Sequence, residues 1–212
     1  MSYKSIEEIF RHNEKWVKAQ LKADPDYFVK LSKRQKPRYL FISCSDSRIS
    51  TEVIMDAEPG DVFIHRNVAN LVPSNDLNTL SAINYAVKHI KVKHIIICGH
   101  YNCGGIKTAM TTSDEGILNP WLRDVRDVYR IHKQELNSIK SLSKKYDRLV
   151  ELNVWEQCIN TMKTRDVQKA LAEKRIQIHG WVFNMKTGRL TDLNFKAERL
   201  AREIMDIYNL FE

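Results

Sequence analysis

The chain has 212 residues, of which 43% are hydrophobic and 28% charged, a composition typical of a soluble globular protein. Its net charge of +8 comes from basic residues that are mixed with acidic ones, without a recognition helix or aromatic platform, so no nucleic-acid partner is expected. No segment is apolar enough to span a membrane and the first residues lack the apolar region of a signal peptide, so we expect a cytoplasmic protein with no membrane partner.

The N-terminal stretch 5–21 places apolar residues at helical spacing among charged ones, and Asp24-Pro25 interrupts the pattern. The resulting amphipathic helix precedes the first strand and has no core of its own to pack on. We therefore expect a single domain in which residues 1–35 form a helical arm and residues 36–212 an α/β core.

Strands and helices are predicted to alternate through the first hundred residues. Apolar runs predict strands at 39–42, 62–65 and 95–98, with helices at 51–55 and 76–90 between them. This β-α-β-α-β order indicates parallel strands joined by right-handed crossovers. The expected fold is α/β, with a mostly parallel sheet of order 2-1-3-4 flanked by helices.

The second half of the chain is predicted to complete the sheet. Between residues 118 and 174 we expect two long helices separated near residues 141–147. A further strand at 176–183 and a hairpin turn then lead into an antiparallel edge strand at 190–195, before a last helix at 196–210.

Polar residues follow two of the buried strands directly. After strand 39–42 the chain reads S-C-S-D-S-R, and after strand 95–98 it reads G-H-Y-N-C-G-G. In an open α/β sheet, ligands bind beyond the carboxyl ends of adjacent strands where the winding reverses. Cys44, His100 and Cys103 are therefore expected to meet, with Asp46 within reach. Two thiolates and an imidazole, completed by a carboxylate or water, are a donor set that zinc accepts, so one Zn²⁺ per chain is predicted.

Asp46 and Arg48 lie two residues apart on the first of these turns. Pairing with Arg48 would keep Asp46 ionised and away from zinc, which leaves a coordination position for water. The opposite arrangement, with Asp46 bound to zinc, would close the site. The other two cysteines, Cys98 and Cys158, lie in an apolar run and a predicted helix, so we expect them to be packing residues.

The two motifs, C-S-D-S-R and G-H-Y-N-C-G-G, together resemble the paired signature of the β-class carbonic anhydrases. The stretch 58–72, the helix of Tyr85 and H-G-W-V-F at 179–183 also match, so the resemblance covers roughly residues 35 to 210. It implies reversible, zinc-dependent hydration of carbon dioxide to bicarbonate and a proton, by zinc-hydroxide attack with the Asp46–Arg48 pair orienting the bound water. It also implies that the arm packs on a partner subunit, in a homodimer or a dimer-of-dimers tetramer.

Two other functions are compatible with these residues. One is a non-catalytic zinc protein in which Cys44, Asp46, His100 and Cys103 close a structural tetrahedron. The isolation of Cys44 from the other cysteine and the arginine beside Asp46 favour the enzyme over this alternative. The other is a hydrolase of the same fold that acts on carbonyl sulfide or carbon disulfide, which the sequence does not separate well from carbon dioxide hydration.

A bacterial subset of the resembled family, type II, binds bicarbonate away from the zinc through a Trp, an Arg and a Tyr. The matching positions in this chain are taken as Phe41, Arg66 and Tyr85. Because Phe41 has no indole N–H, we expect bicarbonate control to be weakened while the open–closed switch of Asp46 is kept. Purely structural roles for Arg66 and Tyr85 are the alternative.

Overall fold

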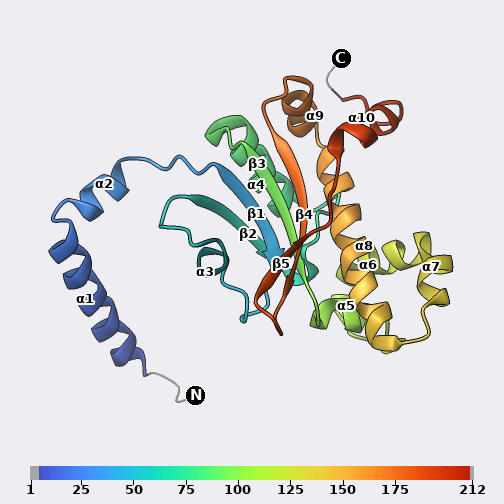
Figure 1. The fold of residues 1–212 in the computed structure, drawn as a ribbon, viewed down its shortest axis with the longest axis horizontal. Helices are drawn as coiled ribbons and strands as arrows, with labels where there is room; N and C mark the ends of the chain where they lie inside the picture. Colours follow the sequence, from blue (N-terminus) through green and yellow to red (C-terminus); the bar gives the residue numbers. More distant parts are fainter. Residues whose placement is uncertain (1–4, 211–212) are drawn as a thin grey trace. The chain divides into compact units, whose positions relative to one another are not determined.

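The computed structural model (Figure 1) describes residues 5–210, and the chain divides after Lys36 into two compact units. The first unit contains helices α1 (Ile6–Ala23) and α2 (Tyr27–Lys33). The helix expected from the N-terminal pattern is therefore present. Helix α2 was not predicted, because seven residues are too few for an apolar periodicity to be recognised.

Helix α1 begins at a capping box, in which the hydroxyl of Ser5 accepts from the Glu8 amide and the Glu8 carboxylate accepts from the Ser5 amide. Within residues 5–210, none of the residues of α1 is buried. An apolar stripe stays exposed along the helix, formed by Ile6, Ile9, Phe10, Trp16 and Leu21. A helix with such a stripe needs another surface to cover it.

The second unit is built on a sheet whose strand order in the described chain is β2-β1-β3-β4-β5 (Figure 1). The first four strands are parallel, and β5 pairs antiparallel with β4. The predicted fold class, strand order and antiparallel edge are confirmed. The strands are β1 (Tyr39–Cys44), β2 (Val62–Asn67), β3 (His94–His100), β4 (Gln177–Asn184) and β5 (Arg189–Asp192).

Strand β5 ends earlier than predicted, at Asp192 instead of residue 195. The chain leaves the sheet there, and the buried Phe195 ring packs edge-on against Trp155 with ring centroids 4.9 Å apart. The apolar residue that suggested a longer strand is therefore used to cover the sheet and not to extend it.

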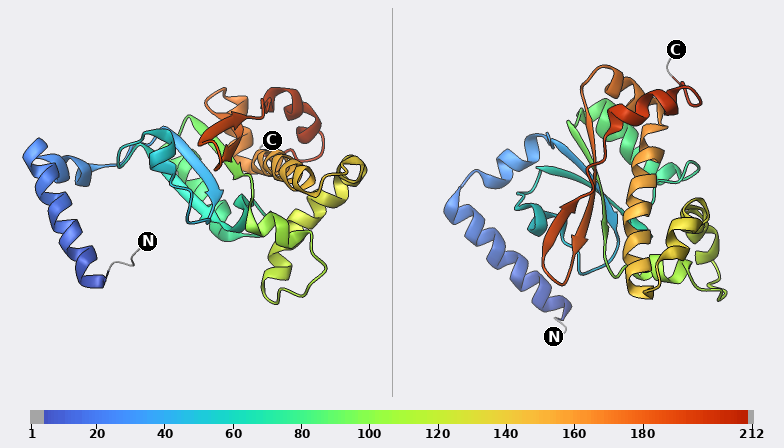
Figure 2. Two further views of the ribbon diagram at one scale, coloured as in Figure 1. Left: turned by 60° about the horizontal axis from the view of Figure 1, so that its bottom comes forward. Right: turned by 45° about the vertical axis from the view of Figure 1, so that its right-hand side comes forward.

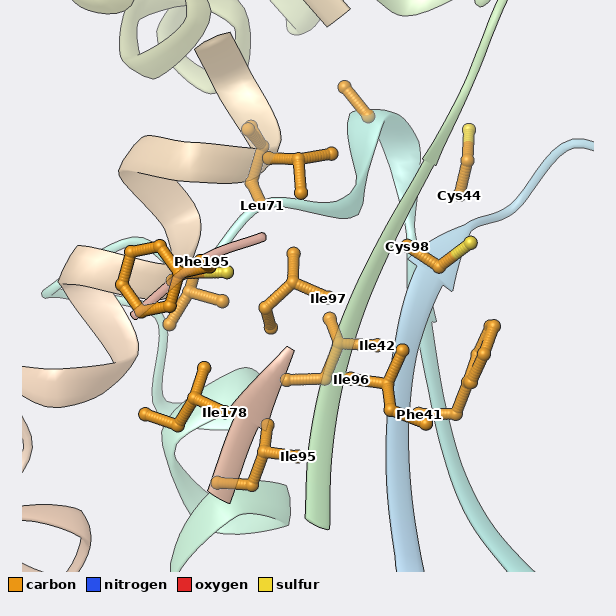
Figure 3. Close-up of a cluster of buried hydrophobic side chains, with 14 of the residues drawn as sticks. Phe41, Ile42, Cys44, Leu71, Ile95, Ile96, Ile97, Cys98, Ile178 and Phe195 are labelled. Carbon is orange, nitrogen blue, oxygen red and sulfur yellow. The ribbon is translucent and has the colours of Figure 1, made fainter. Parts of the chain in front are cut away.

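The two central strands, β1 and β3, are buried on both faces, as their unbroken apolar runs indicate. Ile42 pairs with Ile97 and Phe41 with Ile96, and because successive side chains alternate, the two pairs lie on opposite faces. Figure 3 shows Ile97 pointing toward the helices and Phe41 pointing away from them. We call the face of Ile42 and Ile97 the helix face and the face of Phe41 and Ile96 the far face.

Helices connect the strands, and Figure 2 shows the longest of them, α8, running along the sheet. Asp76 caps α4 by accepting from two amides of the first turn, and a π-helix, η2 (Tyr85–Ile90), continues it. None of the helices within residues 5–210 is long and apolar enough to cross a membrane. The remaining helical elements are α3 (Thr51–Met55), the 3₁₀ turn η1 (Val68–Asn70), α4 (Leu77–Asn84), α5 (Gly104–Ala109), α6 (Leu118–Ile131), α7 (Lys133–Ser138), α8 (Leu142–Met162), α9 (Arg165–Ala172) and α10 (Ala197–Met205).

The region expected to form two long helices contains four, α6 to α9. The expected break near residues 141–147 is placed too late, since α7 ends at Ser138 and α8 begins at Leu142. The hydroxyl of Ser141 accepts from the Lys144 amide, so this serine is the cap of α8. The polar residues that suggested a loop lie in the first turns of that helix.

Two glycines of the sheet allow α8 to approach the helix face closely. A Cβ atom at Gly99 would lie 2.6 Å from Cγ2 of Val154 and 3.2 Å from Cγ1 of Val150. A Cβ atom at Gly180 would lie 3.2 Å from Cγ1 of Val154. The end of β3, which carries His100, is therefore fixed by direct contact between its backbone and α8.

We predict that Gly99→Ala lowers the free energy of unfolding by about 1–3 kcal/mol, because the added methyl overpacks the contact with Val154. Chemical denaturation of the purified protein measures this. Gly180→Ala should lower the free energy of unfolding by less, because its added methyl would lie farther from Val154. The double variant Gly99→Ala/Val154→Ala should lose less stability than the sum of the losses in the two single variants, because Val154→Ala removes the clashing atom. Full additivity would show that the clash is relieved elsewhere.

Candidate metal centre

Three metal-ligating side chains meet at the carboxyl end of the central strands. Cys44 is the last residue of β1, His100 is the last residue of β3, and Cys103 directly precedes α5. One ligand atom from each lies within 4.8 Å of the other two, and all three side chains are buried. The convergence expected from the sequence is therefore present, because β1 and β3 are adjacent and parallel.

The imidazole of His100 has one nitrogen free for a metal. Its Nδ1 lies 3.1 Å from the carbonyl oxygen of Tyr101, which can only accept, so the proton is on Nδ1 and the lone pair on Nε2. Nε2 is buried and has no hydrogen-bond partner among the described residues. A buried nitrogen without a partner is costly unless it binds a ligand. A metal-binding histidine usually donates from its other nitrogen to a carbonyl or carboxylate oxygen, as His100 does here.

The two thiols are surrounded by N–H donors. The Sγ atoms of Cys44 and Cys103 lie 3.8 Å apart, and the hydrogen bond between them lowers the pKa of Cys44 and raises that of Cys103. The amides of Ala69 and Asp46 also lower the pKa of Cys44, and those of Ile106 and Gly105 act in the same direction on Cys103. Such donors stabilise the thiolate, which is the form that binds a metal.

The turn η1 packs closely on the start of α5. This packing brings the Ala69 amide to the sulfur of Cys44 and the Gly105 amide to the sulfur of Cys103. Ala69 has a φ angle of 66°, and its carbonyl accepts from the side-chain amide of Asn153 at 3.0 Å. A Cβ atom at Gly105 would lie 2.9 Å from Cγ1 of Val68, so only glycine allows this approach. The sequence suggested that Gly104-Gly105 let the backbone come near the metal, but it gave no sign that Ala69 donates.

Asp46 is paired with Arg48 and stands beside the metal centre. Its Oδ1 accepts from Nε of Arg48 at 2.9 Å and from the Arg48 amide at 3.0 Å, and its Oδ2 accepts from Nη2 at 2.6 Å. These bonds hold the pKa of Asp46 well below its usual range. Oδ2 also lies 3.8 Å from Nε2 of His100. The carboxylate is therefore near the ligand atoms while both of its oxygens are engaged by the arginine.

A second arginine, Arg66, holds the backbone of the same turn. Its Nε and Nη2 donate to the carbonyl of Cys44 at 3.0 and 2.9 Å, and Nη2 also donates to the carbonyl of Asp46 at 2.7 Å. The main chain that carries one metal ligand and the carboxylate is thus fixed by one guanidinium. Sequence reasoning missed this contact, because it depends on β2 lying next to β1.

Of the three residues expected to bind bicarbonate, Phe41 and Arg66 lie on one face of the sheet. Arg66 pairs with Ser43, so it lies on the far face with the fully buried Phe41. Tyr85 packs against Phe63, with ring centroids 5.8 Å apart. Because Phe63 pairs with Leu40, it lies on the helix face. Tyr85 thus contacts a residue of the helix face, and a bicarbonate site formed by Phe41, Arg66 and Tyr85 stays a prediction.

The two remaining cysteines pack in the core. Cys98 and Cys158 are 1% and 0% exposed, and burial raises the pKa of both thiols, that of Cys98 to about 12. Neither thiol belongs to the group of ligands described above. These positions match the packing role expected from the sequence.

A cavity of about 890 Å³ opens beside the exposed side of Arg48. Among the described residues, basic side chains outnumber acidic ones along its wall, which includes Lys107 and Lys186 but a single carboxylate, Asp147. Burial raises the pKa of Asp147. The arrangement gives an anion a favourable potential next to the Asp46–Arg48 pair.

Known proteins match this chain along most of its length. A family model described as carbonic anhydrase matches residues 39–190. The carbonic anhydrase of Emericella nidulans is 52% identical over 205 residues, which are 96% of this chain and 90% of that protein.

Solved structures match the fold as well. The β-carbonic anhydrase CafA of Aspergillus fumigatus superposes with a TM-score of 0.90 at 34% identity, covering 97% of this chain and 99% of that one. A structure described among two tetrameric β-carbonic anhydrases of Sordaria macrospora gives a TM-score of 0.85 at 37% identity, over 88% of this chain and 95% of that one. On this agreement of sequence and fold, the chain belongs to the carbonic anhydrase family and is an enzyme of its β class.

Proposed function

We propose that the protein catalyses the reversible hydration of carbon dioxide to bicarbonate and a proton, with one zinc ion per chain held by Cys44, His100 and Cys103. The observation that carries the proposal is the pairing of both Asp46 oxygens with Arg48, beside three convergent ligands. Three protein ligands leave a coordination position for water, as catalytic zinc sites require, whereas four would close the site.

The donor set fits zinc. Two thiolates and a neutral imidazole are ligands that zinc prefers, and the unpartnered Nε2 of His100 and the amide donors to both sulfurs suit that role. A zinc ion in this site supplies the Lewis acid that makes water a nucleophile near neutral pH. The two thiolate charges balance that of the ion, so the buried site carries little net charge.

The residues around the site have separate tasks in this proposal. Arg48 keeps Asp46 ionised and oriented, and the carboxylate accepts a hydrogen bond from the attacking water, which orients its lone pair toward carbon dioxide. Arg66 holds the backbone carbonyl of Asp46, so the carboxylate can change position by rotation of its side chain while the main chain stays fixed. The basic cavity beside Arg48 favours the approach and release of bicarbonate.

Stopped-flow hydration of carbon dioxide by protein of measured zinc content tests the proposal. Turnover should rise in proportion to zinc. Fully zinc-loaded protein without hydration activity would instead support a structural zinc site. Carbonyl sulfide and carbon disulfide should be assayed in parallel, because hydrolysis of either without hydration of carbon dioxide would support the alternative substrate class.

The first prediction from the proposed function concerns the ligands. Cys44→Ser and Cys103→Ser should lose zinc and activity together, because a serine hydroxyl does not ionise to replace the thiolate. Cys158→Ser is the matched control, since this thiol is buried away from the site, and it should keep both zinc and turnover. Elemental analysis and the hydration assay measure the two quantities. Full zinc occupancy in Cys44→Ser would contradict the assignment.

The second prediction concerns the Asp46–Arg48 pair. Arg48→Ala should retain zinc but lose activity by about 100-fold or more, because the carboxylate is no longer held as an oriented acceptor. Arg48→Lys restores a charge without the two parallel hydrogen bonds and should recover only part of the rate. Unaltered turnover of zinc-loaded Arg48→Ala would show that the pair has no such role.

We also propose that the protein is a homodimer or a dimer-of-dimers tetramer, in which residues 1–35 form an arm that packs on a partner subunit. The exposed apolar stripe of α1 and the tetrameric assembly of the Sordaria macrospora enzymes support this. A cytoplasmic location is proposed from the sequence, and the four free cysteines of the structure suit a reducing compartment.

The arm yields a third prediction. The double change Ile9→Glu/Phe10→Glu puts two charges in the apolar stripe and should shift the protein to a smaller assembly, measured by light scattering after size-exclusion chromatography. Lys15→Glu changes a charge on the exposed polar side of the same helix and should leave the assembly intact. An unchanged mass in the double variant would show that the stripe is not an interface.

A further inference from the structure

Two histidines outside the metal centre meet on the far face of the sheet. Nδ1 of His94 lies 3.1 Å from Nε2 of His179. His94 begins β3 and His100 ends it, so the pair lies about 20 Å from the metal centre, at roughly 3.3 Å per residue. The proposed reaction uses neither histidine.

The two rings are held in place by the sheet. His94 pairs with Gln177, two residues before His179 on β4, so the histidines are diagonal neighbours on adjacent strands. The ring of Tyr39 is stacked on that of His94, with centroids 5.3 Å apart and an angle of 23°. The ring of Trp181 lies 5.8 Å from that of His179. Both imidazoles are half-buried, so solvent still reaches them.

We propose that His94 and His179 form a second binding site, made of two imidazole nitrogens, for a borderline divalent transition-metal ion. Bonds from such ions to imidazole are about 2.0–2.1 Å long, and two of them at tetrahedral or square angles place the nitrogens about 2.9–3.4 Å apart. The observed separation of 3.1 Å falls in this range. Cu²⁺ should bind more tightly than Ni²⁺ or Zn²⁺, following the general order of affinity at nitrogen sites.

The charges around the pair favour neutral rings, which are the form that binds a metal. Burial lowers the pKa of His94 and of His179, and the charge of Arg38 lowers the first further. For His179, His94 and Lys196 act in the same direction, and Asp192 opposes them. Asp192 pairs with Trp181 across β4 and β5, so it lies on the same face of the sheet. Two nearby cations and one carboxylate predict a modest affinity for a metal ion.

The same distance also fits an N–H···N hydrogen bond between two neutral rings, which would join β3 to β4 without any ligand. In that state one facing nitrogen carries the proton. When a metal binds, this proton moves to the other nitrogen of the same ring, so no net proton is released. The heat of Cu²⁺ binding at pH 7.5, measured by calorimetric titration, should therefore be the same in two buffers of different ionisation enthalpy.

Titration of the zinc-loaded protein with Cu²⁺ tests the proposal. Calorimetry should show one Cu²⁺ per chain while the zinc content stays unchanged. Electron paramagnetic resonance should show nitrogen ligands, and the optical spectrum should lack a thiolate-to-copper charge-transfer band. His94→Ala and His179→Ala should each weaken Cu²⁺ binding at least tenfold. His132→Ala is the matched control, because this half-buried histidine is paired with Glu156 at 3.0 Å, and it should bind Cu²⁺ as the wild type does.

Gln variants keep the test decisive if the Ala variants are unstable. His94→Gln and His179→Gln preserve a side-chain donor and acceptor, so the protein should keep its zinc, while the rise in Tm that Cu²⁺ causes in the wild type should disappear. Equal Cu²⁺ affinity in the wild type and all variants would overturn the proposal. So would the absence of a second equivalent, or copper bound only in exchange for zinc with sulfur ligands.

Discussion

The parallel pairing of β1 with β3 is the constraint on which the site depends. Cys44 and His100 come from segments more than fifty residues apart, and they meet because each ends one of two adjacent strands that run in the same direction. Both strands are apolar on both faces, so burial fixes their place at the centre of the sheet. The contact of α8 with the backbone of Gly99 then fixes the end of β3 along its axis.

Burying two sulfur atoms and an imidazole at one point is unfavourable unless their charges and lone pairs are matched. The backbone provides part of this match through N–H groups directed at both sulfurs, and these depend on the close approach of η1 to α5 at Gly105. The unpartnered Nε2 of His100 is the part that the described residues leave unmatched. The fold thus tolerates a locally unfavourable nitrogen, as proteins do where a ligand binds.

The sequence allowed the strand order and the ligand group to be predicted because both follow from rules about strand ends. Apolar runs identify central strands, and ligands gather beyond the carboxyl ends of those strands. It did not allow the face of the sheet covered by a helix to be predicted. The contact of Tyr85 with Phe63, a residue of the helix face, could for this reason not be predicted. The donors Ala69 and Arg66 were missed because their contacts join segments whose distance in space is set by packing alone.

The two arginines of the site restrict how Asp46 can move. Arg66 holds the carbonyl of Asp46 and that of Cys44, while Arg48 holds the carboxylate. If only the bonds to Arg48 break, the side chain rotates while the backbone stays fixed, and Oδ2 starts from 3.8 Å away from Nε2 of His100. A change between the open and closed arrangements therefore needs no movement of β1 or of Cys44. The hydrogen bonds between Arg48 and Asp46 would then hold the open arrangement, and the exposed side of Arg48 faces the basic cavity.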